Sequence, residues 1–70
     1  MNKKVEKKLA RIKSMIEEIQ SMCDCALDDC DEVMKCEDLF IIESQFDRII
    51  RKADCARDVV LEVYDDLEEE

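Results

Sequence analysis

Apolar and small side chains recur along the first half of the chain at alternating spacings of four and three residues. The positions are Val5, Leu9, Ile12, Ile16, Ile19, Cys23, Ala26, Cys30 and Val33. This is a heptad repeat, which is typical of one face of a long helix, whereas a strand would alternate with a period of two. The pattern predicts a helix over residues 3–34.

A second heptad repeat occupies the other half of the chain, out of phase with the first. Its positions are Leu39, Ile42, Phe46, Ile49, Ala53, Ala56, Val60, Val63 and Leu67. The phase break predicts a turn at 34–38 and a second helix over 38–68. Asn2 and Asp38 are suitable N-caps, and Lys35 suits the C-terminal dipole of the first helix.

The two repeats match when the chain is folded back about Cys36, which pairs residues whose numbers add to 72. Charge supports this pairing, because residues 1–16 carry a net +5 and residues 59–70 a net −6. Each cluster has the wrong sign for its own helix end, and an antiparallel arrangement brings the two together. The predicted fold is all-α: a two-helix antiparallel hairpin forming a single domain over residues 1–70.

More apolar side chains exist than one hairpin can cover. Those flanking the two repeats are Met15, Met22, Leu27, Met34, Ile50, Val59 and Tyr64. Because so small a domain has only about 3–5 kcal/mol available from a single core, we expect a homodimer that forms a four-helix bundle. Phe40, Ile41 and Leu61 point further outward and are candidates for contact with a different partner.

Composition excludes most other classes. The 70 residues contain no Gly, Pro or His, so sandwiches, barrels, phosphate-binding loops and dinucleotide fingerprints are excluded, as are His-based catalytic sites. No apolar run approaches the 18 residues of a membrane span. We expect no enzymatic activity, no cofactor and no membrane partner.

Five cysteines stand at positions 23, 25, 30, 36 and 55. They lack the paired spacing of a zinc site, and an odd number does not suit a disulfide framework. We therefore expect no metal and no disulfides, and thiols that act as small apolar or incidental side chains. A reducing, cytoplasmic location follows from this expectation.

Carboxylates crowd the middle of the chain, where residues 24–47 carry nine acidic side chains against Lys35 alone, a net −8. One interpretation is a solvated face that provides solubility. The other is a docking site for a basic protein surface. The partner could then be a nucleic-acid-binding protein, because closely spaced carboxylates imitate the phosphates of a nucleic-acid backbone. Direct binding to nucleic acid is disfavoured by the same charge. The candidate partner-binding residues are Asp24, Asp28, Asp29, Asp31, Glu32, Glu37, Asp38, Phe40, Ile41, Glu43 and Asp47.

We therefore expect a small acidic inhibitor or adaptor; by analogy alone, chains of this size and charge are often phage-encoded inhibitors of host or defence proteins. The segment 43–50 (ESQFDRII) also resembles the Ser-Gln-x-Leu-Asp signature of helical-hairpin phosphatases that act on phosphorylated response regulators in spore-forming bacteria. Here Ser44 and Gln45 stand one residue too close to Asp47. That resemblance implies an alternative, a regulatory hairpin with Asp47 as its key residue. A third hypothesis is a protein with a purely structural role as a four-helix bundle.

Overall fold

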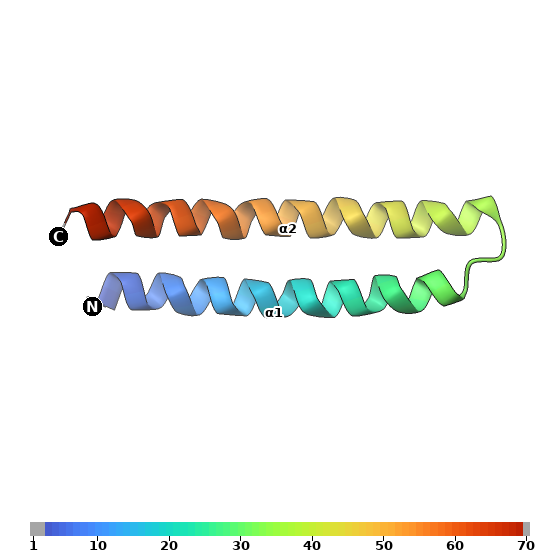
Figure 1. Cartoon of the computed structure of the whole chain (residues 1–70), viewed down its shortest axis with the longest axis horizontal. Helices are drawn as coiled ribbons and strands as arrows, with labels where there is room; N and C mark the ends of the chain where they lie inside the picture. The colour runs from blue at the N-terminus through green and yellow to red at the C-terminus, as the bar shows by residue number, and fades with distance from the viewer. Residues whose placement is uncertain (1–2, 70) are drawn as a thin grey trace.

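A computed structural model describes residues 3–69, which form two long antiparallel helices joined by a short turn (Figure 1). Helix α1 spans Lys3–Asp31 and helix α2 spans Cys36–Glu68. The hairpin is a rod with Cα extents of 54 × 15 × 9 Å, and the start of α1 and the end of α2 lie at the same end of it. The prediction of an all-helical hairpin is confirmed.

The turn lies slightly earlier than the sequence indicated. Helix α1 ends at Asp31, three residues before the expected position 34, and α2 begins at Cys36 instead of residue 38. Lys35 is consequently the N-cap of α2 and does not belong to the end of α1. The expected cap at Asn2 lies outside the described residues.

Asp38 stabilises the start of α2 from inside the helix and not as its N-cap. Its Oδ2 accepts hydrogen bonds from the backbone N–H groups of Met34 (2.9 Å) and Lys35 (3.2 Å). A carboxylate at this position serves two N–H groups that precede the first helical hydrogen bond and also complements the helix dipole. No residue from 3 to 69 has a positive φ, so the reversal needs no glycine. Extended backbone at Lys35 (φ −153°, ψ 167°) contributes to it.

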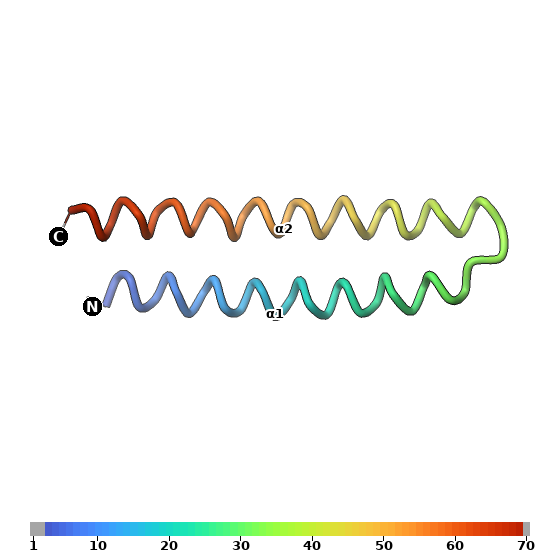
Figure 2. The backbone as a smooth tube through the Cα atoms, in the orientation of Figure 1, coloured from blue at the N-terminus to red at the C-terminus, as the bar shows by residue number. Residues whose placement is uncertain are grey.

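The axial alignment of the helices agrees with the expected pairing. In three ion pairs across the helices, the residue numbers of the two partners add to 70: Lys4–Asp66, Lys8–Glu62 and Glu18–Lys52. In the pair Lys8–Asp66 they add to 74. The expected sum of 72 lies midway between these values, and each differs from it by about half a helical turn. The helices consequently run side by side along the whole rod (Figure 2).

The faces that meet differ from the predicted repeats by a rotation of both helices. In α1 the buried or half-buried residues are Val5, Lys8, Ile12, Met15, Ile19, Met22, Ala26 and Asp29. In α2 they are Asp38, Ile42, Gln45, Ile49, Lys52, Ala56, Val59, Val63 and Asp66. Every second position of the predicted heptad repeats lies in the observed helix interface. At each of the other positions, the interface instead contains the residue that comes just before the predicted one.

Half of the predicted contact residues are therefore on the surface. The exposed ones are Leu9, Ile16, Cys23, Cys30, Leu39, Phe46, Ala53, Val60 and Leu67. The small apolar core instead gathers Ile12, Met15, Ala56 and Val59, the last only 3% exposed. Within the described chain, neither helix contains a stretch apolar enough to cross a membrane.

Candidate docking site at the turn end

The turn end, which we define as residues 24–47, presents most of its carboxylates to solvent. The exposed acidic residues are Asp24, Asp28, Asp31, Glu32, Glu37, Glu43 and Asp47. Lys35 is the one basic residue in this range of the sequence, and its Nζ lies 3.7 Å from Glu37. The turn end therefore carries a concentration of negative charge with little internal compensation.

Two of the candidate binding residues have structural roles. Asp29 is half-buried between the helices, where its Oδ2 accepts a hydrogen bond from the Gln45 side chain. Asp38 is also half-buried and is engaged with the backbone of the turn. These two carboxylates hold the hairpin together and are less accessible to a partner than the other seven.

Apolar side chains are exposed among these carboxylates. Met34 lies in the turn and is 91% exposed, and Phe40 and Ile41 follow on the first turns of α2 with 69% and 54% exposed. The sequence analysis identified Phe40 and Ile41 but placed Met34 beside the helix interface. The signal for Met34 was its position at the phase break, where the chain leaves the first helix.

The opposite end of the rod is held by a cluster of ion pairs. The Asp66 carboxylate, 7% exposed, lies 2.8 Å from Lys8 Nζ and 3.2 Å from Lys4 Nζ, and Lys8 also approaches Glu62 at 3.5 Å. The Lys8 hydrogen bond is the main cause of the lowered pKa of Asp66, and the same bond raises the pKa of Lys8. Basic and acidic charges therefore neutralise each other at the open end, which leaves the turn end as the acidic pole.

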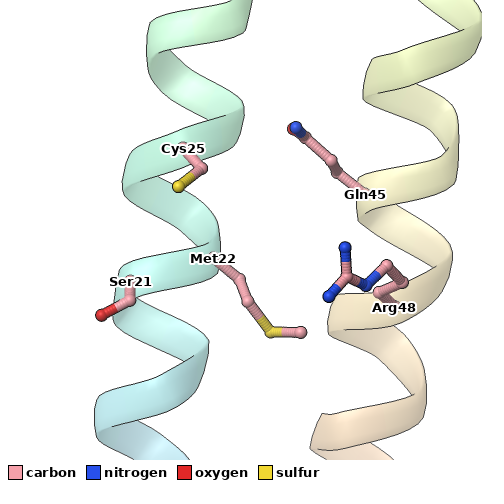
Figure 3. A pocket seen from close by; sticks show the side chains of 5 residues that line it. All are labelled: Ser21, Met22, Cys25, Gln45 and Arg48. Carbon is pink, nitrogen blue, oxygen red and sulfur yellow. The ribbon is translucent and has the colours of Figure 1, made fainter.

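A shallow pocket of about 280 Å³ lies near the middle of the rod, lined by Ser21, Met22, Cys25, Gln45 and Arg48. Figure 3 shows Met22 and Gln45 reaching into the space between the helices. Gln45 Oε1 is buried there without a hydrogen-bond partner among the described residues. The lining combines a hydroxyl, a thioether, a thiol, an amide and a guanidinium, and it includes no carboxylate that could act as a base.

The cysteines are dispersed over the surface. All five are free and exposed. Across residues 3–69, no three Cys, Asp or Glu side chains come together in a way that could hold a metal ion.

The segment that resembles the phosphatase signature lies on α2. Asp47 is exposed, and Gln45 turns toward α1, where it bonds to Asp29. Ser44 Oγ donates a hydrogen bond to the backbone carbonyl of Phe40, 3.0 Å away. Ser44, Gln45 and Asp47, the polar residues of the resemblance, thus have three different surroundings.

Comparison with other proteins adds no assignment to this geometry. No protein-family model, no curated protein and no solved structure matches the chain.

Proposed function

We propose that this chain is a non-enzymatic interaction protein that docks its turn end on a basic surface of a larger protein, as an inhibitor or an adaptor. The observation that supports this proposal is the combination of three exposed apolar side chains, Met34, Phe40 and Ile41, with a surrounding group of exposed carboxylates. A surface that served only solubility would not need three exposed apolar side chains among its acidic residues.

The two kinds of residue have different roles in such an interface. Apolar anchors that become fully buried supply most of the affinity, and Met adapts to irregular surfaces. Carboxylates around them attract a basic partner over long range and reject acidic ones. A row of carboxylates on a rigid helix also resembles the charge of a nucleic-acid backbone, so a nucleic-acid-binding protein is a suitable partner.

The setting we propose is a reducing compartment such as the cytoplasm, because five exposed thiols would oxidise elsewhere. We also propose that the working form is a dimer of hairpins, the four-helix bundle expected from the surplus of apolar residues. The alternative of a regulatory hairpin acting on a phosphorylated response regulator is tested separately through Asp47.

The test compares proteins captured from a lysate of the source organism by the natural chain and by two matched variants. In the tip variant, four exposed carboxylates become amides: Asp28→Asn, Asp31→Asn, Glu32→Gln and Glu37→Gln. In the control variant, the same change in charge is made elsewhere on α2: Asp54→Asn, Asp58→Asn, Asp65→Asn and Glu68→Gln.

We expect at least one protein that the natural chain captures to be captured by the control variant and not by the tip variant. For that purified protein, the association rate with the natural chain should fall as salt is raised, because the steering charges are screened. If the tip variant and the control capture the partner equally well at low salt, the acidic residues form a solvated face and the proposal is wrong.

A further inference from the structure

Some of the apolar residues that the hairpin leaves exposed form a continuous stripe along one side of it, and others, such as Leu27, Ile50 and Tyr64, lie elsewhere on its surface. We define the lateral face as Leu9, Ile16, Cys23 and Cys30 of α1 with Leu39, Phe46, Ala53, Val60 and Leu67 of α2. In both helices these positions come one residue after a residue of the helix interface. Because the helices are antiparallel, a step of one residue rotates them in opposite senses about the rod, and both stripes face the same way.

The hairpin interface is more polar than this lateral face. Between the helices lie Lys8, Asp29, Gln45, Lys52 and Asp66, while the adjacent Leu9, Phe46 and Leu67 are 38%, 54% and 47% exposed. A hairpin that had to be stable alone would turn its most apolar stripe toward the other helix. The observed rotation instead requires that something else cover the lateral face.

The size of the rotation matches a four-helix bundle. At 100° per residue, the centre of the heptad repeat read from the sequence lies about 50° from the centre of the stripe that contacts the other helix. In a bundle of four helices, each helix directs its core residues toward the central axis, which lies about 45° from the direction of either neighbour. The direction of the repeat is therefore the one that a helix of a four-helix bundle would have.

We infer that the lateral face binds a second copy of this chain, with the two hairpins antiparallel and their turn ends at opposite ends of the dimer. The rod on which this face lies has Cα extents of 54 × 15 × 9 Å, so a second hairpin has its whole length available for contact. A stable interface of standard size takes about 800 Å² from each partner, and the broad side of the rod projects an area of that order.

Charge selects the antiparallel arrangement. Residues 3–13 of α1 carry a net +5, and residues 24–31 of the same helix carry a net −4. When the turn ends point in opposite directions, α1 of one copy lies against α1 of the other, and each basic segment faces an acidic one. The two α2 helices then bring acidic segments together, but each turn end of net −8 lies beside an open end that is nearly neutral. With the turn ends together, two segments of net −8 would instead lie side by side and repel each other.

The spacing of the lateral face is compatible with a two-fold axis across the middle of the rod. On α2 the stripe is centred on Ala53, which would meet its own copy, while Phe46 meets Val60 and Leu39 meets Leu67. On α1 the stripe is centred between Ile16 and Cys23. The ion pair between Glu18 and Lys52, at 2.6 Å, shows that these two centres lie at the same height. One axis therefore serves both helices.

The first test is the mass of the protein in solution, which requires no knowledge of the docking partner. The inference rests on the dimer proposed above but not on docking at the turn end, so the two can fail separately. Sedimentation equilibrium of the natural chain at tens of micromolar should give about twice the chain mass of 8.2 kDa. Val60→Glu should shift the protein to the monomer, whereas Leu61→Glu, at a neighbouring exposed position facing away from α1, should remain dimeric. Ile16→Glu provides a second disrupting variant if Val60→Glu does not fold by circular dichroism.

The second test concerns orientation. In a chain whose five cysteines are replaced by Ser, Ala53→Cys should form a disulfide-linked dimer under mild oxidation, because position 53 lies on the axis. Leu61→Cys in the same background should not. A monomeric natural chain, a dimer that survives both Val60→Glu and Ile16→Glu, or a dimer in which Ala53→Cys does not cross-link would each overturn the inference.

Discussion

The two methionines at positions 15 and 34 offer a direct test of the packing. Both are replaced by Ala, so the chemical change is the same in each variant. Met15 is 8% exposed and packs with Ile12, Ala56 and Val59, whereas Met34 is 91% exposed in the turn. The structure therefore predicts very different costs for the same substitution.

The magnitude for Met15→Ala follows from burial. Removing a buried Met side chain costs about 2–5 kcal/mol in protein cores, including the cavity that is left. The value here should lie near the lower limit, at about 2 kcal/mol, because the interface of two helices is open at its sides and can relax. Met and Ala differ little in helix propensity, so that contribution is small. Met34→Ala should change the free energy of unfolding by less than about 0.5 kcal/mol.

The assay is urea unfolding followed by circular dichroism at 222 nm, with both variants and the natural chain at one protein concentration. A fixed concentration is needed because the apparent stability of a dimer depends on it. If Met15→Ala and Met34→Ala were equally destabilised within about 0.5 kcal/mol, Met15 would not lie between the helices and the observed rotation would be refuted. Met34→Ala should in addition weaken binding to the docking partner while the fold is unaffected.

Three further predictions concern charge and chemistry. Because the pKa of Asp66 is lowered and that of Lys8 is raised, their pairing stabilises the fold between about pH 4 and pH 10.5. The difference in melting temperature between the natural chain and Asp66→Asn should therefore shrink as pH falls through the lowered pKa of Asp66 or rises through the raised pKa of Lys8. A difference that stayed constant with pH would contradict this prediction. Protein purified under reducing conditions should contain substoichiometric zinc and keep its melting curve in EDTA; stoichiometric metal, measured by atomic absorption, would overturn the interpretation of the cysteines. Asp47→Asn alone should lower affinity for the docking partner by less than about fivefold, because exposed pairs contribute little individually; loss of all activity toward a phosphorylated response regulator would instead support the alternative function.

The sequence by itself determined the helices, their antiparallel pairing and their alignment along the rod. Heptad spacing identified two long helices, and the absence of Gly and Pro removed the alternatives. Alignment could be predicted because both repeats and the opposite charges at the open end agree on one pairing, which the Lys8–Asp66 contact reflects. The sequence also located the acidic turn end, because the density of charged residues along the chain can be counted without a structure. The two helix ends at the turn were displaced by two to three residues, because the capping role of Asp38 depends on how the turn closes.

The tertiary structure decided which side of each helix meets the other. Val5, Ile12 and Ile19 border two possible stripes, one completed by Leu9 and Ile16 and the other by Lys8 and Met15. Hydrophobicity alone favours the first stripe. The second is selected when Lys8 finds Asp66 and Gln45 finds Asp29 across the interface, and such pairs are known only once both helices are in place. Periodicity gives the direction in which a helix needs to be buried, but the neighbour that buries it is a property of the assembled structure.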